Sequence, residues 1–276
     1  MSPDILIAIV YGFIVGISLG LTGGGGSIFA IPLLIYGLHL DMVQAVPVSL
    51  IAVAMTAAIG SYFSWRAGLL LWQPISMFAS GGIIGAPIGI YYSRYFSQQT
   101  LLSGFAVLAV VVGVMMWRKS ITNPSESSVI RAMPTKDDKE PICKLSPDGK
   151  LSFTTPCAII LMFSGLLTGM LSGLFGVGGG FLIVPILMMV INLGIHRAVG
   201  ASLMIITLIG LSGSISTIIN MEFDLYIMAP FIVGSFTGML FGRGIATKIA
   251  GPVLQRIFAT AILFTGITMI LITINS

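Results

Sequence analysis

Two runs of glycine interrupt apolar segments of this chain, and they are the residues best suited to bind a small ligand. They are Gly23, Gly24, Gly25 and Gly26, closed by Ser27, and Gly176, Gly178, Gly179 and Gly180. Glycine permits positive φ angles and close backbone approach. N–H groups left unpaired at a helix start are donors for an anion. The runs therefore predict an anion site lined by backbone; the alternative is that these glycines only let helices pack closely.

Neutral hydroxyl groups and one arginine are the remaining candidate ligands. Ser49 and Ser202 each stand 26 residues beyond the first glycine of a run, and we expect them to line the site. The alternative for both serines is a hydrogen bond between helices. Arg197 would attract anions at the mouth of a cavity, or else only anchor the membrane topology.

We expect no catalytic residue, no cofactor and no metal ion. The sequence has no HExxH motif, no paired carboxylates within an apolar segment and no nucleophile with a base in reach. Acidic residues outside the polar middle fall at segment ends, which disfavours a carboxylate relay for protons or sodium. An anion leaving a cell that is negative inside gains about 2.3 kcal/mol per charge per 100 mV, so voltage alone can drive export.

The composition places the chain in a lipid bilayer. It is 56% hydrophobic and 8% charged, whereas soluble domains carry roughly 25% charged residues. Apolar stretches of about the 20 residues needed to cross are 5–22, 43–63, 73–92, 100–117, 156–175, 198–219, 225–242 and 252–273. The basic residues form no patch interleaved with aromatics, so we expect no nucleic-acid partner.

The two halves of the chain repeat one another. A shift of 153 positions aligns 12–117 with 165–270 without a gap, and eleven glycines fall on glycines. Duplicated halves in a membrane protein are typical of a transporter. We therefore divide the chain into a transmembrane repeat at 1–117, a polar linker at 118–155 and a second transmembrane repeat at 156–276.

Basic residues predict how the chain crosses the membrane. If it turns back at each glycine run, twelve of the thirteen lysines and arginines lie on one side and only Arg94 on the other. If it passes straight through, the split is eight to five. The positive-inside rule favours the turn, with the linker cytoplasmic and both termini outside. Charge does not distinguish a re-entrant hairpin from one that spans fully.

Each half then has an odd number of crossings, so the second repeat enters the membrane from the opposite face. The predicted fold is all-α: a polytopic membrane protein of two inverted-topology repeats, each with a glycine-tipped hairpin helix and three crossing helices. The two tips should face each other near mid-depth. Pro32 and Pro185 should lie in the first turn of the returning helices. Glycines spaced four apart, as at Gly12 and Gly81, predict close helix packing.

The glycine pattern resembles the TauE/SafE sulfite-exporter family. The resemblance rests on the motif from Gly173 through Gly180 to Pro185, its counterpart from Gly20 to Pro32, and the later stretch 81–89. It implies a permease of the bacterial cytoplasmic membrane for small sulfur-containing anions, such as sulfite, sulfoacetate or other organosulfonates. Export is the direction that the resemblance favours.

Together these observations predict a secondary carrier that works by alternating access and binds its anion between the two glycine runs. An anion channel is the nearest alternative, and an intramembrane enzyme or a membrane scaffold is a more distant one. The expected partners are a small anionic substrate and the lipid bilayer, and a homo-oligomer stays open.

Overall fold

The structure, a computed structural model, describes residues 3–24, 26–122, 155–191, 195–218, 225–246 and 251–275. These residues are almost all helical. In chain order they form α1 (Pro3–Thr22), α2 (Gly26–Pro32), the π-helical turn η1 (Leu33–Gly37), α3 (Met42–Arg66), α4 (Trp72–Ser93), α5 (Gln98–Thr122), α6 (Thr155–Phe175), α7 (Gly180–Val190), α8 (Ile195–Ile218), α9 (Leu225–Ala246) and α10 (Gly251–Asn275). Most of the predicted linker lies outside the described residues.

The helices confirm an all-α polytopic membrane protein. Seven of them, α1, α3, α4, α5, α6, α8 and α9, are long and apolar enough to cross a bilayer within the described residues. The eighth predicted segment coincides with α10, which is 25 residues long. Exposed side chains on these helices are largely aliphatic or aromatic, as expected for surfaces that face lipid rather than water.

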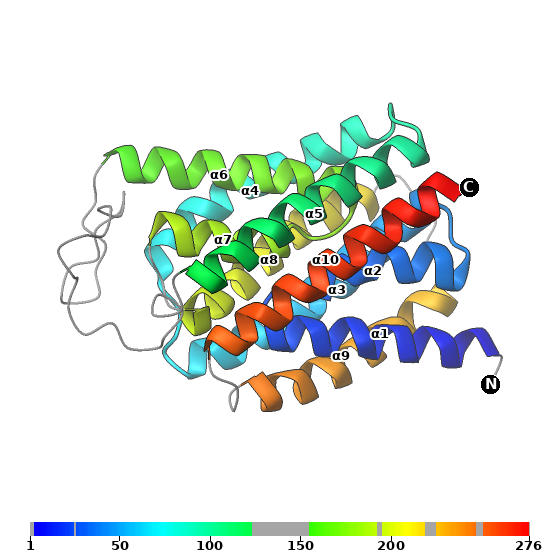
Figure 1. The fold of residues 1–276 in the computed structure, drawn as a ribbon, viewed down its shortest axis with the longest axis horizontal. Helices are drawn as coiled ribbons and strands as arrows, with labels where there is room; N and C mark the ends of the chain where they lie inside the picture. Colours follow the sequence, from blue (N-terminus) through cyan, green and yellow to red (C-terminus); the bar gives the residue numbers. More distant parts are fainter. Residues whose placement is uncertain are drawn as a thin grey trace.

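Helices of the two halves pack in pairs through their glycines. α1 lies along α9, and α6 lies along α4 (Figure 1). A Cβ atom built on Gly12 would lie 2.1 Å from the carbonyl oxygen of Phe231 in α9, and one built on Gly81 would lie 2.0 Å from that of Met162 in α6. Such separations leave no space for a side chain, so the predicted small-residue packing faces are confirmed.

The centre of the bundle is also built from both halves. α3 packs against α8, and α5 packs against α10. α1 runs from right to left in Figure 1 and α6 from left to right, while α5 and α10 also run in opposite directions. Each helix of the first half thus lies against helices of the second, and the core is shared rather than divided.

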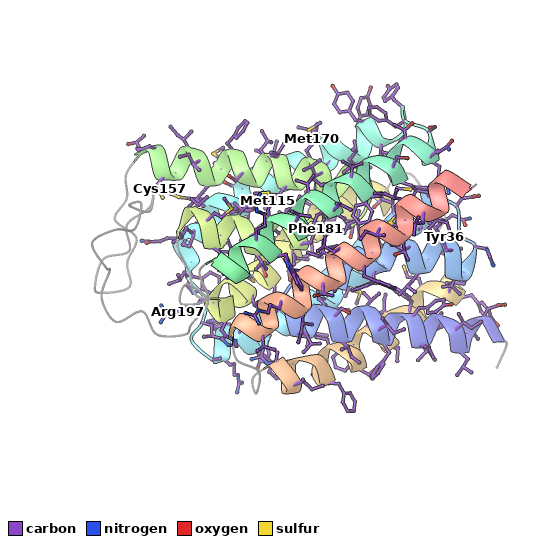
Figure 2. All side chains as sticks on the ribbon, in the orientation of Figure 1. Tyr36, Met115, Cys157, Met170, Phe181 and Arg197 are labelled. Carbon is purple, nitrogen blue, oxygen red and sulfur yellow. The ribbon has the colours of Figure 1, made fainter. Side chains whose placement is uncertain are left out.

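Both glycine runs turn the chain back within the bundle. Tyr36, near the end of the first returning arm, lies at the same end of the bundle as the N-terminus (Figures 1 and 2). The returning arms are the apolar stretches Gly26–Gly37 and Gly180–Val190. At 1.5 Å per residue each is about 17 Å long, well short of the roughly 30 Å hydrocarbon core.

The predicted position of the prolines is wrong. The returning helices begin directly at the last glycine, so Pro185 is the sixth residue of α7 and Pro32 is the last of α2. An interior proline leaves a carbonyl in the preceding turn without its helical donor. In the first arm the chain widens into the π-helical turn η1 immediately after Pro32, a form that often occurs at functional sites.

Candidate functional site

The two glycine runs are in direct backbone contact inside the bundle. A Cβ atom built on Gly24 would lie 2.2 Å from the carbonyl oxygen of Gly180, and one built on Gly180 would lie 2.7 Å from the Cα atom of Gly24. Phe181, the second residue of α7, lies near the middle of the bundle's length (Figure 2). The sequence therefore correctly predicted that the two tips meet.

The tips overlap side by side rather than meeting end to end. Gly23, at the far end of the first tip, packs on Val199 in the first turns of α8, where a Cβ atom would lie 2.5 Å from Val199 Cγ1. Gly176, at the far end of the second tip, packs in the same way on Val46 in the first turns of α3. Because α3 and α8 start at opposite ends of the bundle, each tip reaches past the other.

Ser49 and Ser202 each form a hydrogen bond with the glycine tip of the other half of the chain. The hydroxyl of Ser202 donates to the carbonyl oxygen of Gly23 at 2.6 Å, and the hydroxyl of Ser49 donates to that of Gly176. Both serines are fully buried. Each is also within reach of a carbonyl one turn earlier in its own helix. The serines lie beside the tips as expected, and they hold the glycine backbone in place.

The rest of the first tip is tightly packed. Ser27 is fully buried and donates its hydroxyl to the carbonyl oxygen of Gly24 at 2.7 Å. A Cβ atom on Gly26 would lie 2.4 Å from the carbonyl oxygen of Val15 in α1. Gly25 lies outside the described residues. The hydroxyl of Ser27 therefore stabilises the turn, as those of Ser49 and Ser202 stabilise the contacts between halves.

The second tip holds hydrogen-bond donors that have no acceptor in the described part of the chain. The N–H groups of Val177, Gly178 and Gly179 donate to no other described residue. Gly176, Gly178 and Gly179 have φ angles of 68°, 70° and 64°, which only glycine adopts readily. α7 starts at the next residue, so the positive end of its dipole adds to these donors.

A buried hydroxyl beside these N–H groups is also unpaired. The Oγ atom of Ser172 in α6 has no hydrogen-bond partner among the described residues, and the side chain is 1% exposed. A Cβ atom on Gly179 would lie 3.6 Å from this oxygen. An unsatisfied buried hydroxyl is costly, so the hydroxyl of Ser172 and the three N–H groups are candidate donors for a ligand. Ser172 was not among the residues predicted from the sequence, and its counterpart in the repeat is Leu19.

A cavity approaches the second tip from the end of the bundle where α4 ends and α5 begins. Its volume is about 350 Å³, and Val46, Ile90, Ser93, Arg94, Gln98 and Thr217 are among its lining residues. Val46 lines this cavity and also packs on Gly176. The cavity therefore reaches a side chain that contacts the tip, at the end of the bundle where Arg94 is the only predicted basic residue.

Arg197 lies away from the two tips. Its side chain is exposed and is seen at the left end of the bundle in Figure 2, the opposite end from Tyr36. It lines neither the tips nor the cavity near Arg94. No group of three or more metal-ligating side chains occurs among the described residues.

Known proteins similar to this chain are membrane transporters. The family model "Sulfite exporter TauE/SafE" matches residues 8–269. A probable membrane transporter protein of Xylella fastidiosa strain Temecula1 is 32% identical over 97% of this chain and 95% of its own length. The probable membrane transporter protein YunE of Bacillus subtilis is 25% identical over 96% of this chain and 97% of its own length. No solved structure matches the chain significantly.

Proposed function

Because the chain belongs to the TauE/SafE family of membrane transporters, we propose that it is a secondary carrier that exports a small sulfur-containing anion by alternating access. The family description names sulfite, and we include sulfoacetate and other organosulfonates as related small sulfur-containing anions. The membrane is the bacterial cytoplasmic membrane, with the linker inside and both termini outside, as the distribution of basic residues favours.

The observation that carries this proposal is the set of unpaired donors at the second tip. Val177, Gly178 and Gly179 offer three backbone N–H groups, and Ser172 offers a buried hydroxyl. An oxyanion is the ligand that accepts several such bonds at once. Backbone N–H groups carry no net charge, so they bind the anion less tightly than a charged side chain would. The anion can therefore dissociate.

A cavity at one end of the bundle and hydrogen bonds between the halves support alternating access. The cavity beside Arg94 is lined by Val46, which packs on Gly176, and the proposed topology places this cavity on the outer side. Ser49 and Ser202 tie each tip to a helix of the other half, so a shift of one half against the other moves the tips with it. We expect substrate to enter between the tips when Gly24 and Gly180 separate, with Ser27, Ser49, Ser202 and the first glycine run near it.

A binding experiment tests the proposed site. Purified protein is heated with sulfite, sulfoacetate, taurine or sulfate, and the shift of the thermal midpoint gives the affinity for each. Replacing Ser172 by alanine removes one hydrogen bond to a charged ligand, and we expect the affinity to fall about 10-fold or more. Ser214→Ala is the matched control, because this buried hydroxyl already donates to Gly210 within its own helix.

A transport experiment separates the carrier from its alternatives. Flux of the best-binding anion in proteoliposomes should saturate and should show counterflow. Large unitary currents would instead identify a channel. No flux and no thermal shift with any of the four compounds would refute the proposed substrate class, and equal binding by Ser172→Ala and wild type would refute the proposed site.

A further inference from the structure

We propose that Arg243 is the cytoplasmic gate of the transport pathway and the residue that first binds the anion on that side. The inference rests on the proposed anion transport. Arg243 stands in the last turn of α9, and sequence patterns alone gave it no role beyond membrane topology. Its surroundings in the folded chain give it a second one.

The guanidinium group of Arg243 links two helices, α9 and α3. Its Nη1 atom donates to the carbonyl oxygen of Gly60 in α3 at 3.2 Å and lies 3.4 Å from Ser64 Oγ. The Cζ atom is 5.0 Å from the centre of the Phe63 ring. The group is only partly exposed. Arg243 thus links α9 to the end of α3 through uncharged hydrogen-bond partners.

The backbone of Arg243 also touches the helix that leads into the tip. A Cβ atom on Gly20 of α1 would lie 2.8 Å from the Arg243 nitrogen. Ser64 in turn packs on Gly200 of α8, where a Cβ atom would lie 3.5 Å from Ser64 Oγ. Arg243 therefore contacts α1 and α3 directly, and its partner Ser64 contacts α8 next to Val199, the residue on which Gly23 packs.

The repeat supplies an internal comparison, because the equivalent place in the other half is open. The shift of 153 positions pairs Arg243 with Ile90, Ser64 with Thr217 and Val199 with Val46. Ile90, Thr217 and Val46 line the cavity near Arg94. Where the outer side has this cavity, the inner side has the side chain of Arg243 at the position equivalent to Ile90, bonded to the equivalent of Thr217.

Charge chemistry explains why an arginine suits this position. A guanidinium group forms stronger hydrogen bonds with an oxyanion than with a carbonyl or a hydroxyl. Among the described residues no carboxylate forms an ion pair with Arg243, so its charge is not neutralised there. An anion arriving from the cytoplasm can therefore displace Gly60 and Ser64 as partners, which releases α9 from α3 and opens the path to the first tip.

Sided kinetics test this role. Zero-trans flux of the best-binding of the four compounds is measured with the anion on the cytoplasmic face only, and then on the outer face only. We expect Arg243→Gln to raise the cytoplasmic KM about 10-fold or more and to leave the outer KM within about twofold. Arg243→Lys should recover part of the loss. Equal changes in KM on both faces, or none, would overturn the binding role.

A labelling experiment tests the gate without relying on transport. In a chain whose Cys143 and Cys157 are replaced by serine, Ser64→Cys places a thiol under the guanidinium group. This thiol should resist a membrane-impermeant reagent added on the cytoplasmic side and should react faster once Arg243→Gln is added. Unchanged labelling would overturn the gate, whether or not the chain carries any of the four anions. Failure to carry any of the four anions would refute the proposed function and not the gate.

The matched control is Arg66→Gln. Arg66 is an exposed arginine at the end of α3 whose Cζ atom lies 5.3 Å from the centre of the Tyr62 ring, and it forms no hydrogen bond with a described residue of the first tip. The Arg66→Gln variant removes one positive charge, as Arg243→Gln does, from the end of the bundle where α3 and α9 end. An equal rise in KM for Arg66→Gln would mean that general electrostatic attraction, and not the position of Arg243, accounts for the effect.

Discussion

The contact between the two tips can be tested by adding a single methyl group at Gly24. The Cβ atom of alanine at this position would lie 2.2 Å from the carbonyl oxygen and 2.4 Å from the carbonyl carbon of Gly180. Both are backbone atoms, which cannot rotate away as a flexible side chain can. An ordinary contact begins near 3.4 Å, so the tips must separate by about 1 Å to admit Gly24→Ala.

The size of the effect follows from the cost of overpacking. Inserting a methyl group into a well-packed site costs about 1–3 kcal/mol. The conformation with the tips in contact loses that stability, whereas conformations with separated tips do not. At about 1.4 kcal/mol per decade, the closed conformation becomes roughly 5- to 150-fold less populated relative to the others, and we expect transport to fall over the same range.

Flux in proteoliposomes and the thermal midpoint of purified protein measure the two consequences. The control is Gly104→Ala in α5, whose Cβ atom would meet only the ring of Phe175 at 3.5 Å. This variant should keep wild-type flux and gain slightly in helix stability. If Gly24→Ala folds and transports as well as Gly104→Ala does, close contact of the tips has no part in the transport cycle.

Two further predictions concern the serine hydrogen bonds that hold the tips and the membrane topology. Ser49→Ala and Ser202→Ala each leave a buried glycine carbonyl without its hydroxyl donor, so each should lower the free energy of unfolding by about 1–3 kcal/mol. Thermal unfolding of the two single variants and of the double variant should give nearly additive losses, because the two serines bond to separate tips. A single variant as stable as wild type would contradict the role of these hydrogen bonds in holding the tips. A phosphatase that is active only outside the cytoplasm should be inactive when inserted into the linker after Lys144 and active when fused after Ser276; the reverse pattern would mean that the repeats enter the membrane in the opposite sense.

Much of the fold could be predicted because it depends on properties of single segments. Apolar length located the crossing helices, and the break at each glycine run located the turns. Glycines four residues apart, such as Gly12 and Gly16, marked the faces that pack closely. The partners of these faces could not be predicted, because one small-residue face fits another equally well in lipid and α1 could have paired with any of them.

The roles of individual polar residues were harder to predict. Ser49 and Ser202 were placed beside the tips, but a sequence does not say that each would bond to the glycine run of the other half. Ser172 has no polar counterpart in the repeat, so the comparison of halves gave it no weight. Arg243 was counted only as a topology charge, although its pairing with Ile90 is the one signal in the sequence that sets it apart.

The cross-pairing of the two halves also fixes the order in which the protein can be completed during synthesis. α1 is made first, yet the helix that fills its glycine face is α9, which leaves the ribosome some 200 residues later. α4 is likewise made before α6, the helix that covers its glycine face. The first half therefore stays in the bilayer with two grooved faces open to lipid until its partners arrive, and a chain that stops at the linker has no means of closing them.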